Sequence, residues 1–348
     1  MLYWIIFLLI SLTLAYLSTS SKFEKRVREI AKCLLIIFVV YFSGFREGLG
    51  QDYEGYYQNL INGSYLDISN HEPLLSLIAN LIYYTNLSPH FFFLFCSLVT
   101  NLLFFKSFYR YQNTFIIIFI YLTGTIFFFN TFNLVRQMFA ASIFMFSTKY
   151  IENKNFFKYL FCIVIASTMH ISSLFLLPVY FIARKNFPNF VYIITLGLSI
   201  IFGQILVVDL SVLLSKFMNL YEVYLNTDIS TSSGLLTLFF NLYLVLFLLF
   251  KNRLLLKTKY IIVFNMYFVG VILYNLIPSF FYIFRFAIYF IVFAPIALTF
   301  SSKIIGRYLS NFILILVFSI MFFMFLYNAA DNNRVVPNKI LPLNIMVD

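Results

Sequence analysis

Long apolar runs, separated by short polar segments, dominate this chain and restrict what it can fold into. About twelve of them approach or reach the length that a helix needs to cross the hydrocarbon layer of a membrane. They cover residues 2–19, 30–44, 89–105, 114–130, 134–149, 156–169, 171–183, 190–208, 234–250, 260–277, 286–300 and 311–327. Because 62% of the residues are hydrophobic and only 11% are charged, a soluble fold would expose too much apolar surface. The sequence therefore predicts an all-α, polytopic membrane protein.

A thirteenth run, at 73–88, is short and broken by polar residues. Basic residues of membrane proteins are concentrated in cytoplasmic loops, so their distribution indicates whether this run crosses the membrane. If it dips in and returns, 18 of the 24 Lys and Arg residues lie on one side, whereas a full crossing divides them 10 to 14. We therefore expect about twelve spans plus one re-entrant or interfacial segment, with both termini outside.

This topology gives the two surfaces opposite charge. The inside carries +15 (18 basic minus 3 acidic residues) and the outside −4 (6 minus 10). The excess of basic residues behind the net charge of +11 thus lies on the inside, where it faces anionic inner-leaflet lipid. It reflects the topology and does not indicate a nucleic-acid partner. We expect a single membrane domain over 1–348, with external segments at 45–72, 209–233 and 328–348, of which the first holds an interfacial helix.

Polar residues that are distant in sequence gather at the predicted outer surface. They are Arg46, Asp52, Glu72, Arg136, His170 and Arg285. Ionisable groups at membrane depth usually face the protein interior or a wet cavity and mark functional paths. The three arginines have few acids beside them, which favours an anionic ligand such as a pyrophosphate-linked lipid. The three cysteines lie inside apolar runs, and we predict no metal site and no cofactor.

Each of these groups also has a purely structural interpretation. Asp52 can cap an interfacial helix whose aromatic face includes Tyr56. Arg136 and Gln137 lie in a polar and small-residue stripe, where Arg136 can form an ion pair with Asp52 or Glu72. His170 can cap the turn of a helical hairpin. Arg285 and Tyr289 share one helix face, as is typical of the Arg and Tyr residues at a membrane interface.

Five stretches together resemble the EpsG family of exopolysaccharide proteins. They are "FREGLGQDYEGYY" at 45–57, Glu72–Pro73, "LVRQMFAASI" at 134–143, "HISSLFLLP" at 170–178 and "YIFRFAIYF" at 282–290. The resemblance runs from about residue 40 to 340. Asn338 after Pro337 departs from the aromatic residue that the family pattern leads us to expect, so no role is assigned to the tail.

The resemblance implies a bacterial Wzy-like polymerase of the cytoplasmic membrane, a glycosyltransferase with a GT-C-like architecture. Its substrate would be an oligosaccharide repeat unit linked to undecaprenyl pyrophosphate, joined at the outer face, and its partners would include a flippase and a chain-length regulator. Membrane lipid would surround it. The alternatives are a transporter or flippase for lipid-linked sugars, a membrane acyltransferase and a scaffold of an export assembly.

The predicted roles follow from this chemistry. A sugar hydroxyl attacks the anomeric carbon of a lipid-linked chain, and polyprenyl pyrophosphate leaves. Arg136 and Arg285, with Arg46, stabilise the diphosphate, since guanidinium groups grip phosphate oxygens in a planar fork. Asp52 is the first choice for the general base, followed by His170 and then Glu72. The remaining substrate-binding candidates are Tyr56, Gln137 and Tyr289.

Overall fold

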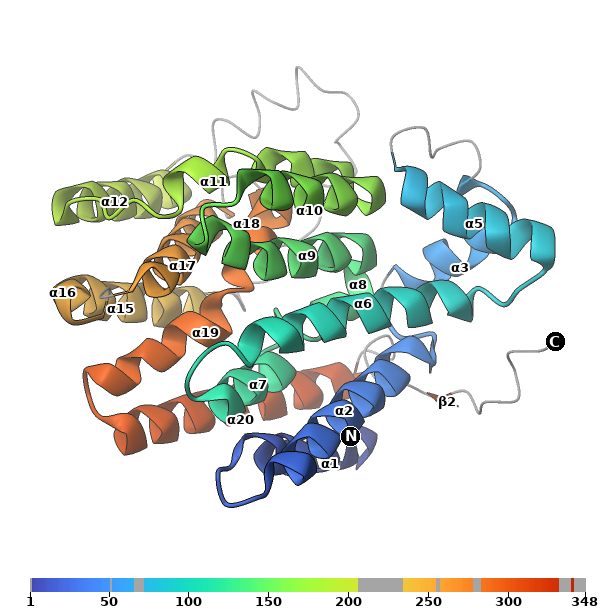
Figure 1. Ribbon diagram of the computed structural model, residues 1–348, viewed down its shortest axis with the longest axis horizontal. Coiled ribbons are helices and arrows are strands. Elements are labelled where there is room, and N and C mark those ends of the chain that lie inside the picture. The colour runs from blue at the N-terminus through green and yellow to red at the C-terminus, as the bar shows by residue number, and fades with distance from the viewer. Residues whose placement is uncertain are drawn as a thin grey trace. The chain divides into compact units, whose positions relative to one another are not determined.

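The computed structural model describes residues 2–50, 52–65, 72–205, 234–254, 257–277, 283–331 and 339–340. Helices make up most of this part of the chain, which confirms the all-α prediction (Figure 1). The two strands described, β1 (Arg46–Glu47) and β2 (Lys339–Ile340), are two residues long and pair antiparallel. The helices group into two compact units, residues 1–178 with 308–348 and residues 179–307.

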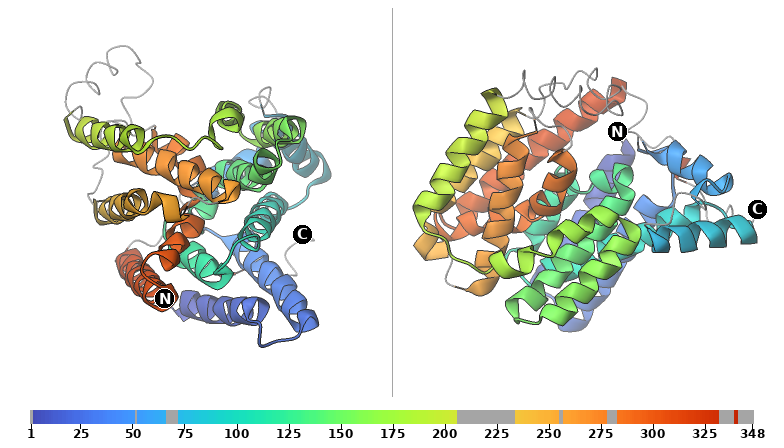
Figure 2. Two further views of the ribbon diagram at one scale, coloured as in Figure 1. Left: turned by 60° about the vertical axis from the view of Figure 1, so that its left-hand side comes forward. Right: turned by 90° about the horizontal axis from the view of Figure 1, so that it is seen from above.

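The first unit contains most of the polar residues singled out above. Its helices are α1 (Leu2–Thr19), α2 (Lys25–Gly44), α3 (Tyr53–Ile61), α5 (Pro73–Thr85), α6 (His90–Phe108), α7 (Thr114–Thr123), α8 (Asn130–Asn133), α9 (Val135–Glu152), α10 (Phe156–Met169), the 3-10 helix η2 (Ile171–Leu176) and most of α20 (Arg307–Asp331). Helix α9 packs against α6 and α10, and α2 packs against α1 and α6. The short helices α3 and α5 pack together at one end of this unit (Figures 1 and 2).

The second unit is built around α17. Its helices are α11 (Val179–Ile182), α12 (Asn189–Ile205), α15 (Gly234–Leu249), α16 (Lys251–Leu254), α17 (Thr258–Asn275), α18 (Ile283–Ile291), α19 (Ala294–Leu298) and the 3-10 helix η4 (Thr299–Lys303). Helix α17 packs against α12, α15, α18 and α19. Both units contain apolar helices. The single membrane domain over 1–348 stays a prediction.

Exposed hydrophobic side chains cover the outer faces of many helices. Phe157 on α10, Phe190 on α12 and Leu235 on α15 are 79%, 62% and 76% exposed. Soluble proteins rarely expose so many large apolar side chains, whereas membrane proteins present them to lipid. The aromatic rings of Trp4, Phe7 and neighbouring phenylalanines instead pack inside the first unit. The chain is therefore a membrane-embedded protein.

The number of spans stays a prediction. Three helices are long and apolar enough to cross a membrane, namely Leu2–Thr19, His90–Phe108 and Arg307–Tyr327, by length and composition alone among the described residues. The bent pair Ile283–Ile291 and Ala294–Lys303, with 46° between its parts, would be a fourth. The run at 171–183 is divided at Pro178 into η2 and α11, because proline cannot continue a helix.

Helix α5 occupies the run expected to be re-entrant or interfacial. Pro73 begins it at a position where a helix needs no N–H donor, and Asn86, with φ 54°, ends it in the left-handed conformation. Its 13 residues cover about 20 Å, which is less than the roughly 30 Å hydrocarbon core. Its position relative to the membrane stays a prediction.

The other two predicted external segments are described only in part. The loop 209–233 lies outside the described residues, and α20 extends into the predicted tail, to Asp331.

Two glycines shape the turn between α2 and α3. Gly48 and Gly50 have φ of 64° and 108°, which favour glycine. A Cβ on Gly50 would lie 2.5 Å from the carbonyl oxygen of Phe132 and 3.1 Å from Oδ1 of Asn133, whereas a Cβ on Gly48 would meet nothing within 4 Å. The turn therefore packs directly against the chain that leads into α9.

We expect Gly50→Ala to destabilise the protein more than Gly48→Ala does. Both alanines would carry the cost of a positive φ, about 1–2 kcal/mol, and only Gly50→Ala would add the clash with the Phe132 carbonyl. The midpoint of thermal unfolding in detergent, measured for both variants and the wild type, checks this. Equal midpoints for the two variants would contradict the close packing of Gly50.

Candidate functional site

Arg136 lies in the first turn of α9. The chain breaks between α8 and α9 at Leu134, which has φ −92° and ψ 52°, so α9 begins as a separate helix. Ala140 and Ala141 are fully buried one turn further on, and such small residues let neighbouring helices approach closely. The start of α9 thereby brings Arg136 near α3 and α5, with 27% of its side chain exposed.

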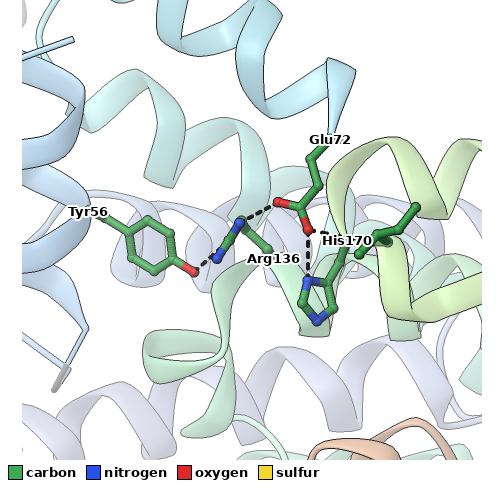
Figure 3. A network of polar contacts seen from close by, with 5 residues as sticks. Tyr56, Glu72, Arg136 and His170 are labelled. Atoms are coloured by element: carbon green, nitrogen blue, oxygen red, sulfur yellow. Dashed lines mark hydrogen bonds and ion pairs between the residues drawn. The ribbon is translucent and has the colours of Figure 1, made fainter. Parts of the chain in front are cut away.

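The guanidinium group of Arg136 links two other elements. Its Nη1 forms an ion pair with Oε2 of Glu72, the residue before α5. Its Nε donates a hydrogen bond of 3.0 Å to the hydroxyl of Tyr56 on α3, and the guanidinium lies 5.6 Å from the centre of that ring (Figure 3). Among the described residues, none accepts a hydrogen bond from Nη2. One donor nitrogen of a partly exposed arginine is therefore available to a ligand.

The other carboxylate oxygen of Glu72 binds the junction between α10 and η2. Oε1 lies 3.1 Å from Nδ1 of His170 and accepts a hydrogen bond of 3.2 Å from the backbone N–H of Ile171. His170 ends α10 in an extended conformation, with φ −151° and ψ 106°, which turns its ring toward Glu72 (Figure 3). Glu72 and His170 are 12% and 14% exposed. One carboxylate thus joins α5, α9 and the α10–η2 junction.

The environment of Glu72 keeps its carboxylate ionised. Burial raises its pKa, but the hydrogen bond with His170, the positive charge of Arg136 and the Ile171 N–H together outweigh burial and lower the pKa below its usual value. An ionised carboxylate only accepts hydrogen bonds, so Nδ1 of His170 carries a proton toward it. Neutral His170 then has its lone pair on Nε2, for which the described residues provide no hydrogen-bond partner.

Tyr56 completes the network as an acceptor. It is 7% exposed, and burial raises its pKa to about 12, so it is protonated at neutral pH. Its hydroxyl oxygen accepts from Arg136 and keeps its own proton. Tyr56, Glu72, Arg136 and His170 form the Glu72 network, which is the candidate site.

The lowered pKa of Glu72 predicts a stability that depends on pH. Because the folded-state pKa lies below the unfolded value of about 4.3, the ionised carboxylate stabilises the fold above that pH, and this contribution is lost as the pH falls through the folded-state pKa. We expect the wild type to unfold at a higher temperature than Glu72→Gln at pH 7 and the difference to shrink below about pH 4. Thermal unfolding at both pH values checks this, and a constant difference would contradict it.

The family comparison identifies the chain. The family model described as the EpsG family matches residues 29–342 of the 348. The chain belongs to the EpsG family. No curated protein and no solved structure matches it. Membership confirms the resemblance and implies a polymerase-type membrane protein of polysaccharide biosynthesis, in a family associated with glycosyltransferase-like polymerases.

Arg46 of this EpsG-family chain lies in a buried position. It is 2% exposed, and its guanidinium lies between the rings of Phe93 and Phe132, 4.8 and 4.9 Å from their centres. It donates to the backbone oxygens of Ser43 (2.9 Å) and Phe132 (3.2 Å). Burial lowers its pKa to about 10, so it is charged at neutral pH. Its contacts tie the end of α2 to the residues before α9, and its predicted contact with a ligand stays a prediction.

Asp52 precedes α3, but its predicted capping role is wrong. Its φ of −89° and ψ of −2° lie in the helical region, and its side chain makes no capping hydrogen bond. A helix cap usually has an extended backbone, from which the side chain reaches back to the first turn. The charge of Asp52 does act on Tyr56 and Tyr65, which places it near the Glu72 network. Its role as a base stays a prediction.

The remaining predicted site residues lie on α9 and α18. Gln137 is buried, at 3% exposure, next to Arg136. Arg285 is exposed and Tyr289 is buried within the second unit, so the two do not present a common exposed surface. A meeting of Arg285 with Arg136 stays a prediction. No three His, Cys, Asp or Glu side chains gather as metal ligands within the ranges that the structure describes.

Two contributions escaped sequence reasoning. The Ile171 N–H binds Glu72, and His90 contacts Tyr53 on α3. A backbone N–H has no sequence signature, although proline at 73 does signal that Glu72 stands at a helix start. His90 follows Ser88 and Pro89 at the start of an apolar run, which also signals a helix N-terminus.

Proposed function

We propose that this protein is a polysaccharide polymerase that joins oligosaccharide repeat units linked to polyprenyl pyrophosphate. The single observation that carries the proposal is the Glu72 network, in which a partly exposed arginine and an oriented imidazole share one carboxylate. In a family of polymerase-type membrane proteins, these two groups match the two needs of the reaction: an anionic leaving group and a proton acceptor.

Arg136 is the diphosphate ligand in this proposal. Guanidinium groups bind phosphate oxygens through two parallel hydrogen bonds, and Arg136 has Nη2 available beside Nη1. A diphosphate that approaches these nitrogens competes with Glu72 for Nη1. Glu72 keeps its bonds to His170 and the Ile171 N–H after that exchange, so its charge stays compensated. Arg136 then stabilises the charge that develops on the diphosphate as it leaves.

His170 is the general base. The acceptor sugar hydroxyl forms a bond to the anomeric carbon of the donor, and the bond from that carbon to the diphosphate oxygen breaks. The electron pair leaves with polyprenyl diphosphate, and the hydroxyl proton passes to Nε2 of His170. Glu72 holds the opposite nitrogen protonated and stabilises the imidazolium that forms. Water receives the proton afterwards. The contacts favour His170 over Asp52 for this role.

Replacement of Glu72 by glutamine separates binding from catalysis. The amide no longer competes as an anion for Arg136, so we expect KM for the lipid-linked donor to fall several-fold. It also cannot stabilise the imidazolium of His170, so kcat falls at least about 10-fold. Steady-state kinetics with a purified repeat-unit lipid measure both. A rise in KM with kcat unchanged would contradict the two roles assigned to Glu72.

The proposed reaction takes place at the outer face of the bacterial cytoplasmic membrane. The predicted topology, which places +15 inside and −4 outside, supports this orientation for Glu72 and His170. Repeat units linked to undecaprenyl pyrophosphate reach that face after a flippase has moved them, and a chain-length regulator is an expected partner. A transporter needs no general base, and an acyltransferase would consume an acyl donor, so product analysis separates these alternatives.

A deletion strain tests the proposal. Without the gene, single lipid-linked repeat units accumulate, and the wild-type gene restores polymer. We expect Arg136→Ala to leave the single units unpolymerised at normal membrane abundance. Arg110→Ala is the matched control, because Arg110 is 26% exposed and forms an ion pair of 2.6 Å with Glu152 away from the network. Long polymer in the Arg136→Ala strain would overturn the proposal.

A further inference from the structure

Helix α3 carries Tyr56 but is too short to hold its position alone. It has nine residues, and isolated helices of fewer than about 12–15 residues are marginal in water. The location of the Tyr56 hydroxyl therefore depends on what anchors α3 to the rest of the first unit. Its buried face consists of Tyr53, Tyr56 and Leu60, at helical spacing.

Besides α5, which packs against α3, the start of α6 anchors this helix through side-chain contacts. The Tyr53 hydroxyl lies 3.1 Å from Nε2 of His90, and Nδ1 of the same ring lies 2.8 Å from the hydroxyl of Ser88. His90 is 6% exposed and Tyr53 is 4% exposed. The buried Tyr53 hydroxyl and the buried His90 ring thus form a hydrogen bond with each other. Removing one of them leaves the other without this bond, which costs stability.

Ring packing reinforces this hydrogen bond. Tyr53 stacks on Phe93 with centres 4.8 Å apart and planes 16° apart, and Tyr56 lies 5.4 Å from Phe92. Phe93 also contacts the guanidinium of Arg46. The first turn of α6 therefore supports both α3 and the turn that leads into it, and Tyr53 lies one helical turn from the residue that binds Arg136.

We propose that His90 is a positioning residue for the Glu72 network. His90 holds Tyr53, and Tyr53 fixes the rotation of α3 about its axis and its position against α6. Helix α3 then places the Tyr56 hydroxyl next to Nε of Arg136. The guanidinium fork is thereby oriented with Nη2 toward the ligand. His90 itself touches neither the network nor the substrate. Its effect on catalysis rests on the proposed function, whereas its anchoring of α3 does not.

A pair of tyrosine variants tests the inference. Tyr53→Phe removes only the hydroxyl that meets His90. Tyr57→Phe makes the same change on the same helix, where the hydroxyl has no hydrogen-bond partner among the described residues and the ring also packs on His90. We expect Tyr53→Phe to lower kcat/KM about 3- to 10-fold, the effect of one hydrogen bond, and Tyr57→Phe to have no effect.

A double variant separates positioning from general damage. If Tyr53 acts through Tyr56, then Tyr53→Phe adds no further loss in a Tyr56→Phe background, since coupled residues are non-additive. Additive losses would contradict the inference. His90→Gln, whose side-chain amide can still form a hydrogen bond with the Tyr53 hydroxyl, should retain most activity, whereas His90→Leu should match Tyr53→Phe.

Hydrogen exchange of α3 gives a readout that needs no activity. We expect the amides of residues 53–61 to exchange about 3- to 10-fold faster in Tyr53→Phe than in Tyr57→Phe, because the anchor is lost. Equal exchange in the two variants would overturn the inference whatever the polymerase assay shows. A wild type that makes no polymer would instead contradict the proposed function, and the exchange result would still decide whether His90 anchors α3.

Discussion

Arg136→Ala is expected to lower the polymerisation rate about 100- to 1,000-fold, the usual effect of removing a group that stabilises transition-state charge. The guanidinium contacts Glu72 through Nη1 and Tyr56 through Nε, and in the proposed reaction the diphosphate binds Nη2 and competes with Glu72 for Nη1. Alanine removes all of these contacts. Initial rates with a purified lipid-linked repeat unit measure the loss.

Arg136→Lys distinguishes charge from geometry. Lysine keeps the positive charge, but it is a point charge that cannot bridge three partners in one plane. We therefore expect the variant to keep less than a tenth of the wild-type rate, which corresponds to a loss of more than about 1.4 kcal/mol of transition-state stabilisation. Arg110→Ala, which breaks an ion pair of similar exposure, should run at the wild-type rate. A lysine variant with full activity would show that only the charge matters.

His170→Ala is expected to lower kcat about 100- to 10,000-fold, the range for loss of a general base. The expected loss is large because, among the described residues, His170 is the imidazole that contacts Glu72, and no other described ring can replace it as the base. Imidazole added to the assay should restore part of the activity in His170→Ala, because it fills the space of the missing ring and accepts the same proton.

Asp52→Asn is the matched test of the rival base. If Asp52 takes the proton, Asp52→Asn shows the large loss and His170→Ala shows a small one that imidazole does not reverse. The opposite pattern is expected here, because Glu72 contacts His170 directly and can stabilise the imidazolium that forms.

Much of the helical architecture could be predicted from hydropathy. The apolar run 2–19 coincides with α1, and the runs 134–149 and 156–169 closely match α9 and α10. The number of spans could not be predicted as firmly, because hydropathy counts apolar residues and does not detect breaks inside a run. Pro178 divides one run, and the bend between α18 and α19 divides another.

The candidate site was predicted in its members but not in its contacts. Sequence reasoning included an ion pair between Arg136 and either Asp52 or Glu72, and the structure has Glu72. The sequence alone does not distinguish the two partners, because Glu72 and Arg136 are 64 residues apart and meet only through helix packing. Arg46 illustrates the same limit: a charged residue next to glycines looks exposed, yet two phenylalanine rings bury it.

The stoichiometry of the reaction tests the central claim most directly. Wild-type protein in liposomes would receive a single lipid-linked repeat unit, and new glycosidic linkages and released polyprenyl diphosphate would be counted together. The account predicts one diphosphate for each linkage in the wild type, and neither product above background in Arg136→Ala or His170→Ala. Linkage formation at the wild-type rate in both variants would show that polymerisation takes place away from the Glu72 network.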